Sequence, residues 1–527
     1  MRLYFTKITF FTFCLFIGIH LSANEYYVSP AGSDSNTGSD INDAFRTIQH
    51  AVDEALDGDI VWVADGTYTE NVIMTVSGVE DYWITLKAIN KHQAKIRSTS
   101  SNCIAVEANY IIIDGFDLQT TGTYGSGVAA NQGHHHIAIQ NCYAHDCGQS
   151  GFQIWDCDFI SIENNICTRN GWLMPYAGSG ISVYGGFNSD NTEGLHNIVR
   201  NNICFNNDNG PETAMTDGNG IIIDDLKCTQ TGHDFTICSL DGYNNVETLV
   251  EGNLCFDNGG RGIQVYLTEN VTVRNNTCYL NSKRDSEGTW RGEIGVSNSD
   301  NLRMVNNIAV CNTDMGFSLS ASNSAFLIAQ YGSHSTKNIT FNNNLSFNIS
   351  KPTDKAFHNL VGASAVKQAN NLFSTDPLFV NASIDSTSAN FMLQEGSPAI
   401  DAGTMEYGKA STDLAGNARA MRTAIDLGCY EALGETLQTG FHLLNKENQL
   451  NIYPNPSLDF LNIQLTTDKL VSFSVTVFSL DGKTELQPII STTLMERLDI
   501  RSLQPGMYIL EVVLNHSQKL SKTFQKF

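Results

Sequence analysis

The chain has 527 residues, which is long for one domain and predicts two or more units. It carries 55 acidic against 31 basic residues, a formal charge of −24. Such a balance excludes general nucleic-acid binding, which needs a basic face. An anionic partner would therefore have to meet a locally basic patch.

The N-terminal segment Met1–Ala23 begins with basic residues, continues with an apolar run over 8–19 and ends in small residues. This pattern is typical of a secretory signal peptide. The run is much shorter than the ~20 residues of a membrane-spanning helix. We therefore expect the segment to be removed and the mature protein to have no transmembrane span.

Apolar residues at helical spacing follow at 44–56, from Ala44 to Leu56. They predict an amphipathic helix. We expect this helix to cap one end of the next domain, because an uncapped end would be a bare sheet edge.

A four-residue motif recurs through the middle of the chain. Its first residue is asparagine or glycine, its second is asparagine, its third is mostly apolar, and its fourth is cysteine or another small residue. The copies are Asn164–Cys167, Asn201–Cys204, Gly252–Cys255, Asn275–Cys278, Asn306–Ala309 and Asn343–Ser346, with weaker copies at 140–143 and 370–373. Counted on the second asparagine, the shortest spacings are 276 − 253 = 23 and 165 − 141 = 24 residues. A period in the twenties with β-branched runs predicts a parallel β-solenoid, whose coils must stack to bury their apolar faces.

Twelve of the 13 cysteines remain once Cys14 leaves with the signal peptide. Several occupy repeat positions, which favours stacked buried thiols over a disulfide framework: Cys142, Cys167, Cys204, Cys255 and Cys278. Cys228 and Cys238 flank a loop and are the best disulfide candidates. No zinc-type spacing occurs, so we predict no zinc site.

A second set of segments aligns on a glycine, beginning with Ser126-Gly127 and ending with Arg291-Gly292. Because side chains alternate along a strand, the fourth residue after each glycine should point outward. This predicts an outward column of Asn131, Trp155, Tyr184, Asp224, Tyr266 and Val296. Trp155 and Tyr184 are the candidate sugar platforms, since the apolar face of a sugar packs on an aromatic ring.

The opening segments 26–30 and 58–68 resemble the start of the pectate-lyase-like β-helix superfamily, and 397–403 with 426–428 resembles its closing segment. The resemblance implies an all-β, right-handed parallel β-helix. It also implies carbohydrate-directed activity, although the superfamily includes lyases, hydrolases, epimerases and adhesive proteins, so the fold does not determine the reaction.

The strongest break in the repeat is acidic. Asp217, Asp224 and Asp225 bring three carboxylates to one coil, and an insertion at 226–245 follows with Lys227, His233 and Asp234. Clustered carboxylates suit Ca²⁺, and the cluster loosely resembles the calcium-binding turns of family-nine polysaccharide lyases. We therefore expect Asp217, Asp224 and Asp225 to bind calcium; the alternative is an ordinary solvated acidic turn.

The second break is basic. Residues 261–303 hold six bases and five acids, which we take as the richest basic stretch of the solenoid. Arg261 and Arg291 both precede an aligned glycine and should be neighbours. The planar guanidinium fork of an arginine can bind a carboxylate or sulfate. The alternative is a surface charge ladder. The run His134–His136 is interpreted as a turn feature, because adjacent side chains point to opposite faces.

These residues favour β-elimination on a uronic-acid sugar. A cation beside the sugar carboxylate would stabilise the charge that forms when the C5 proton leaves. Lys283, His233 and Tyr266 are the candidate bases. The enzyme would be a polysaccharide lyase or an oligosaccharide dehydratase acting on acidic, for instance marine algal, glycans. A β-helix glycoside hydrolase and a non-catalytic glycan-binding surface protein remain alternatives.

The C-terminal unit begins near Asn445 and alternates apolar and polar residues between Pro and Gly turns, which predicts a small β-sandwich. Its motifs at 450–456, 480–483 and 503–510 resemble the type A sorting domain of the type IX secretion system of Bacteroidetes. The resemblance implies that the type IX machinery exports the protein, to the medium or the cell surface. We expect a signal peptide at 1–23, a β-helix at 24–435, a linker at 436–444, a sorting domain at 445–527, and a monomer.

Overall fold

The computed structural model describes residues 23–174, 178–210, 217–230, 246–283, 292–313, 324–419 and 424–432. It also describes 449–453, 460–466, 473–479, 483–491, 495–504, 506–514 and 518–526. Two compact units emerge, one formed by 1–380 with 391–439 and the other by 381–390 with 440–527. Neither unit shows, among the described residues, a helix long and apolar enough to cross a membrane.

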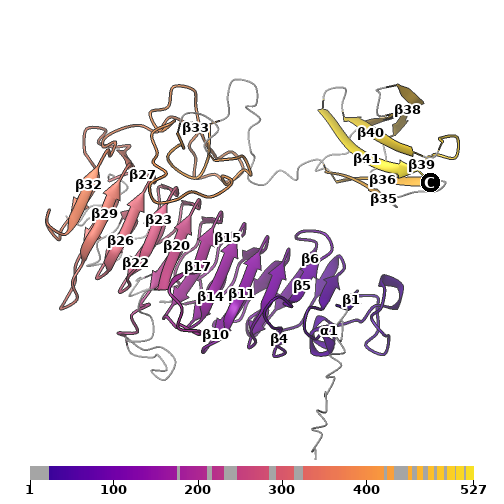
Figure 1. Ribbon diagram of the computed structural model, residues 1–527, viewed down its shortest axis with the longest axis horizontal. Helices are drawn as coiled ribbons and strands as arrows, with labels where there is room; N and C mark the ends of the chain where they lie inside the picture. Colours follow the sequence, from indigo (N-terminus) through magenta and orange to yellow (C-terminus); the bar gives the residue numbers. More distant parts are fainter. Residues whose placement is uncertain are drawn as a thin grey trace, which may run out of the picture. The chain divides into compact units, whose positions relative to one another are not determined.

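Three long parallel sheets build the first unit, and each successive coil adds one strand to each sheet (Figure 1). Sheet A contains β1 (Glu25–Val28), β2 (Ile60–Val63), β5 (Ile84–Ala88), β8 (Ile111–Asp114), β11 (His135–Gln140), β14 (Asp158–Glu163), β17 (Gly194–Arg200), β20 (Val246–Glu251), β23 (Val271–Arg274), β26 (Asp300–Val305), β29 (Lys337–Asn342) and β32 (Val366–Ala369). Sheet B contains β3 (Gly66–Tyr68), β6 (Ala94–Ser98), β9 (Asp117–Thr120), β12 (Tyr143–His145), β15 (Ile166–Thr168), β18 (Ile203–Phe205), β21 (Leu254–Phe256), β24 (Thr277–Tyr279), β27 (Ile308–Cys311) and β30 (Leu345–Asn348). Sheet C contains β4 (Val72–Met74), β7 (Ile104–Val106), β10 (Val128–Asn131), β13 (Phe152–Trp155), β16 (Ile181–Tyr184), β19 (Ile221–Asp224), β22 (Ile263–Tyr266), β25 (Gly292–Ser297), β28 (Ser324–Ala329) and β31 (Phe357–Asn359).

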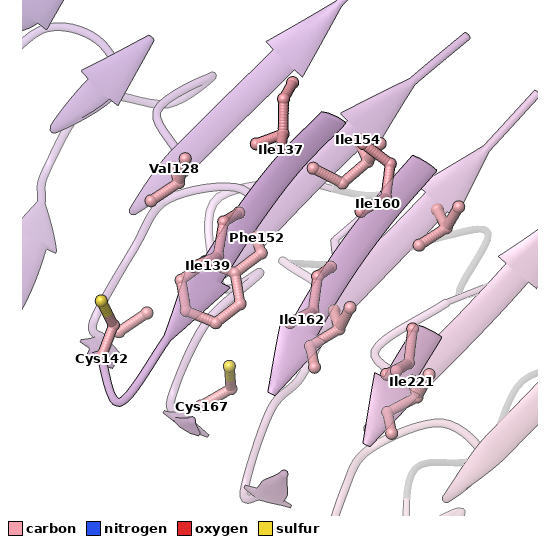
Figure 2. Packing of buried hydrophobic residues seen from close by; sticks show 14 of the residues in the cluster. Val128, Ile137, Ile139, Cys142, Phe152, Ile154, Ile160, Ile162, Cys167 and Ile221 are labelled. Carbon is pink, nitrogen blue, oxygen red and sulfur yellow. The ribbon is translucent and has the colours of Figure 1, made fainter. Parts of the chain in front are cut away.

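This unit is the expected right-handed parallel β-helix. Its interior is filled by the inward residues of all three sheets, and Figure 2 shows side chains such as Ile137, Ile160, Phe152 and Ile154 pointing toward one another. The predicted N-terminal cap is also present. Helix α1 (Ile48–Glu54) buries Ile48, Ala51 and Val52 in the same core.

The helix is shorter than the predicted 44–56. Thr47 caps its N-terminus with its hydroxyl, and the Glu70 carboxylate accepts hydrogen bonds from the first two helical amides. Before it, Phe45 is extended and forms a parallel bridge with Val28. The preceding residues therefore extend sheet A rather than the helix.

The repeated asparagines form a buried ladder at the bend between sheets A and B. Each side chain accepts from the asparagine of the coil before it and donates to that of the coil after it, along Asn165, Asn202, Asn253, Asn276, Asn307, Asn344 and Asn371. Asn141 was counted with these asparagines in the repeat but does not belong to the ladder. The position in register with Asn165 is Cys142, whose amide donates to the Asn165 side chain.

The thiol ladder is confirmed for four of its five predicted members. Cys167, Cys204, Cys255 and Cys278 pair in register in sheet B, are buried and are free thiols. Cys142 was wrongly included, because it lies one residue earlier in its coil, at the asparagine position. Cys228 is disulfide-bonded; Cys238, its predicted partner, lies outside the described residues.

A second asparagine ladder runs at the bend between sheets B and C, through Asn170, Asn207, Asn258 and Asn281. It ends on Glu293, whose carboxyl group accepts from the amide and side chain of Asn281. Glu293 is fully buried, and burial raises its pKa to about 8. The Glu293 carboxyl group thus accepts the hydrogen bonds of Asn281 that an asparagine accepts in the earlier coils.

The segment after the last coil folds back over the later strands of sheet B. Strands β33 (Phe379–Asn381) and β34 (Asn390–Leu393) form a two-stranded sheet, and Phe391 packs on Phe256 and Tyr279. Further on, Arg419 and Glu431 form a buried ion pair at 2.7 Å. The earlier strands of sheet B, from β6 to β15, keep a polar outer face.

The second unit contains two antiparallel sheets that share one apolar core, as expected of a small β-sandwich. The first sheet is β35 (Gln449–Tyr453), β36 (Phe460–Thr466) and β39 (Met495–Asp499). The second is β37 (Phe473–Ser479), β38 (Thr484–Ser491), β40 (Gly506–Leu514) and β41 (Gln518–Lys526).

Candidate functional site

The outward column predicted from the glycine alignment lies at the end of the sheet C strands. Register pairs join Asn131, Trp155, Tyr184, Asp224 and Tyr266 in that order. The predicted sixth member, Val296, is wrong: Ser297 pairs with Tyr266, and Val296 points into the core. Sheet C therefore carries one surface, formed by these side chains and those of Arg261 and Gln264, which we call the sheet C face.

The shift by one residue arises at Glu293. Ile263 pairs with Ile294, so Glu293 stands opposite Gly262 and Gly292 stands opposite Arg261. The predicted alignment of Arg291 with Arg261 is therefore wrong by one residue. Arg291 itself lies outside the described residues.

Two aromatic rings of the column touch. Trp155 and Tyr184 meet edge to face with ring centroids 5.0 Å apart, and both rings are partly exposed. Their role as a platform for a sugar ring stays a prediction. Burial and the nearby carboxylates of Asp225 and Asp224 raise the pKa of Tyr184.

Asp224 lies between the two tyrosines of the column and accepts a hydrogen bond from the Gln230 side chain at 3.0 Å. Burial and the Asp224 carboxylate raise the pKa of Tyr266. A tyrosinate base would need a lowered pKa, so this upward shift argues against that role. Tyr266 is therefore protonated at neutral pH and suited to donate a proton.

Arg261 enters this surface along its own strand. Its Nη1 atom donates to Oε1 of Gln264 at 2.7 Å, so the guanidinium extends toward the Tyr266 end of β22. A Cβ atom on Gly295, in the adjacent strand, would lie 2.7 Å from the Arg261 Cδ and Nε atoms. Because Gly295 has no side chain, the Arg261 side chain can lie over β25 at this position.

Burial lowers the pKa of Arg261, and nearby Tyr331 and Asp217 oppose that change. An arginine stays charged throughout the physiological range. A partly desolvated guanidinium interacts more strongly with an anion than a fully hydrated one does. The sequence showed the arginine; it did not show Gln264 and Gly295, which place it.

The three carboxylates expected to bind calcium do not converge. Asp217 lies before β19, next to Gly260, and Asp224 ends that strand, next to Tyr266. Asp225 turns into the following loop, where Thr229 and Gln230 donate three hydrogen bonds to it. In the part of the chain that the structure describes, no group of three or more His, Cys, Asp or Glu side chains could hold a metal ion. The predicted ligand set thus does not fit one calcium ion.

The other predicted bases are placed elsewhere. Lys283 forms an ion pair with Asp257 at 3.1 Å and donates to Asn206, so it faces the end of sheet B. His233 lies outside the described residues. Of the three candidates, Tyr266 is the one that the structure places on the sheet C face.

The basic stretch 261–303 does not form one cluster. Arg274 pairs with Glu251 and Arg303 with Glu247 on sheet A, whereas Arg261 lies on sheet C. Residues 82–106 are in fact more basic, with four bases and no acid. The prediction that 261–303 is the richest basic stretch was wrong.

Two of the three adjacent histidines do converge, contrary to the argument from alternation. His136 has a left-handed backbone with φ 57°, and this brings its Nδ1 to 2.7 Å from Nδ1 of His135. The His136 ring stacks between Tyr110 and Phe159. The run thus continues an aromatic stack along the bend between sheets C and A.

Residues 451–526 match the family model described as the secretion system C-terminal sorting domain. The C-terminal unit is a sorting domain. This supports type IX secretion and a location outside the cell or on its surface. The match covers this unit alone, so it leaves the activity of the β-helix open.

The β-helix is similar to several solved structures. Pectate lyase Pel9A is 17% identical, with 79% of this chain and 98% of that chain covered and a TM-score of 0.44. A rhamnogalacturonan lyase is 15% identical, with coverage of 71% and 96% and a TM-score of 0.41. The A-module of the mannuronan C-5 epimerase AlgE6 of Azotobacter vinelandii is 16% identical, with coverage of 60% and 82% and a TM-score of 0.34.

The uncharacterized protein YwoF of Bacillus subtilis is 33% identical over 102 residues, which is 19% of this chain and 22% of that protein. The chain thus spans about a fifth of this curated relative's length. Likenesses of this extent do not transfer an activity, which depends on the residues of the site.

Proposed function

We propose that the protein is an exported enzyme that acts by β-elimination on a uronic-acid-containing poly- or oligosaccharide, bound on the sheet C face. The observation that carries this proposal is the position of Arg261. Its partly desolvated guanidinium lies across the same surface as Asp224 and Tyr266. Arg261 would bind the sugar carboxylate and stabilise the negative charge that develops on it.

The elimination breaks the C5–H and C4–O4 bonds and forms a C4–C5 double bond. In our proposal the Asp224 carboxylate accepts the C5 proton and the Tyr266 hydroxyl donates a proton to the leaving O4. The raised pKa of Tyr266 argues against a tyrosinate base, so the protonated phenol is left with the donor role. Trp155 and Tyr184 would hold a neighbouring sugar ring. The leaving group is a sugar for a lyase and water for a dehydratase.

A hydrolase would need two carboxyl groups that flank the scissile bond. Within the described part of the sheet C face, Asp224 stands next to tyrosines rather than a second carboxylate. Asp225 is buried and held by its own loop. This arrangement favours elimination over hydrolysis.

The test is to incubate the protein with pectin, alginate, ulvan and glycosaminoglycans, both polymeric and pre-digested. Elimination produces ultraviolet absorbance from the new double bond, and Arg261→Gln and Asp224→Asn should abolish it. Arg303→Gln is the matched control, since Arg303 lies on sheet A. Reducing ends without absorbance would support the hydrolase, and binding without either product would support a non-catalytic glycan-binding protein.

A further inference from the structure

Strands β6 to β15 of sheet B carry a basic surface, away from the sheet C face. It gathers side chains from the coils of β6 to β15: Lys91, Lys95, Arg97, Asp117, Tyr143, His145, Asp146 and Arg169. We call it the sheet B patch. It includes most of the basic run at 82–106, in a chain whose formal charge is −24.

The carboxylates of this patch are already engaged by its own cations. Asp117 accepts from Arg97 at 2.8 Å, and its carboxylate lies 2.9 Å from Nε2 of His145. Asp146 accepts from two nitrogens of Arg169, each at 2.7 Å, and its carboxylate lies 2.6 Å from Nδ1 of His145. These pairs fix the geometry and leave little negative charge exposed.

The basic side chains of the patch outnumber its carboxylates. Four basic side chains (Lys91, Lys95, Arg97 and Arg169) face two carboxylates (Asp117 and Asp146), so 4 − 2 = 2 positive charges remain before His145 is counted. Burial lowers the pKa of Lys91, and nearby Asp114, which pairs with Lys87 at 3.0 Å, opposes that change. Among the ion pairs between described residues, none involves Lys91 or Lys95. Lys91 and Arg169 are exposed and Lys95 is half-exposed, so these cations are accessible to an anion.

The patch has the shape for an extended ligand. Lys95, Asp117, Tyr143 and Ile166 stand opposite one another on four successive strands. Three inter-strand steps of ~4.8 Å give the patch a length of about 14 Å along the solenoid. The back-folded segment with Phe391 covers later coils, at Phe256 and Tyr279, and so leaves the earlier strands open.

We propose that the sheet B patch is a non-catalytic binding site for an acidic polysaccharide. Lys91, Lys95 and Arg169 supply the charge that carboxylate or sulfate groups of the polymer would meet. The choice of a glycan as ligand rests on the proposed function, whereas the anion-binding role rests on the patch itself. Because sheets B and C are different faces of the solenoid, the patch would hold one stretch of polymer while another lies on sheet C.

The test is affinity electrophoresis of the full chain in gels that contain polygalacturonate, dextran sulfate or neutral dextran. The double variant Lys91→Gln/Lys95→Gln is compared with Lys351→Gln/Lys367→Gln, which removes the same charge from exposed lysines near the other end of the solenoid. We expect the first variant to bind an acidic polymer about tenfold more weakly, with the difference shrinking at high salt, and the control to bind like the wild type.

Three outcomes would overturn the proposal: equal weakening in both variants, no weakening in either, or a loss confined to phosphatidylglycerol vesicles assayed in parallel. Preference for polygalacturonate or for dextran sulfate distinguishes carboxylate from sulfate as the bound group. Turnover of short oligosaccharides separates this proposal from the proposed function. Lys91→Gln/Lys95→Gln should retain it, and binding through the patch without any turnover would refute the enzyme and not the patch.

Discussion

Arg261 lies two residues before β22 and donates a hydrogen bond to Gln264 within that strand at 2.7 Å. The strand places the two Cα atoms about 10 Å apart, so the arginine side chain lies along the strand instead of pointing away from it. The charge of Arg261 therefore acts nearer to Tyr266 than the backbone positions indicate.

Gly295→Ala tests this placement. The added methyl group would meet the Arg261 side chain at 2.7 Å and displace it. We expect kcat/KM on the acidic substrate to fall about 10- to 100-fold, the size of one charge-assisted hydrogen bond. The free energy of unfolding, measured by urea denaturation, should change by less than about 1 kcal/mol, because the flexible arginine side chain can move aside. Gly292→Ala in the same strand is the control and should retain activity.

Tyr266→Phe tests the proton donor. Removing the hydroxyl should lower kcat about 100-fold with little change in KM, as expected for a lost general acid. Tyr184→Phe, one strand beyond Asp224, is the matched variant and should keep kcat. Equal loss of kcat in both variants would contradict the assigned role of Tyr266.

Glu293→Gln tests the buried carboxyl group at the end of the second asparagine ladder. The folded pKa of about 8 exceeds the ordinary value of 4.5, so the folded state binds the proton more tightly than the unfolded state. The stability that this group contributes is fully present below pH 4.5 and is lost as the pH rises toward 8.

The glutamine variant carries no such proton. Its free energy of unfolding, relative to the wild type, should therefore rise between pH 5 and 9 by on the order of a few kcal/mol. Denaturant titrations at several pH values measure the difference. The partly exposed Glu163→Gln serves as control, and a constant difference between Glu293→Gln and wild type would count against the raised pKa.

Asn253→Ala interrupts the first asparagine ladder. The change leaves the Asn202 amide and the Val199 carbonyl without their partner in the core. At ~1–3 kcal/mol for each buried group, the protein should lose about 2 to 6 kcal/mol of stability. Urea unfolding measures this loss. Asn90→Ala, which removes an exposed side-chain bond to Asp65, should cost far less.

The sequence predicted the β-helix because its asparagines recur at the spacing of one coil. It did not predict register to one residue. Glu293 occupies a glycine position of the repeat, and Cys142 occupies an asparagine position. Neither register shift can be recognised from a single sequence. Candidate residues such as Trp155, Tyr184 and Asp224 were still placed correctly, since they precede the shift.

The sequence could not show toward which sheet each charged side chain points. Lys283 and Arg261 come from successive coils at the bend between sheets B and C. The Lys283 side chain nevertheless turns to Asp257 of sheet B, and the Arg261 side chain turns to Gln264 of sheet C. Asp217 and Asp224 are seven residues apart (224 − 217) and are separated by the strand between them. A count of charges in a window cannot distinguish such cases.

The ladder of Cys167, Cys204, Cys255 and Cys278 has a consequence for export. Neighbouring strands bring their Cα atoms to about 4.8 Å, a distance at which a disulfide could form. All four sulfur atoms are fully buried, so an oxidant dissolved in the surrounding water cannot reach them in the folded protein. Protection therefore begins only when a coil has docked on its neighbour. Each added coil covers the sulfur atom of the coil before it. In a protein that leaves the cell, the order in which the coils assemble therefore decides when each thiol is protected from oxidation.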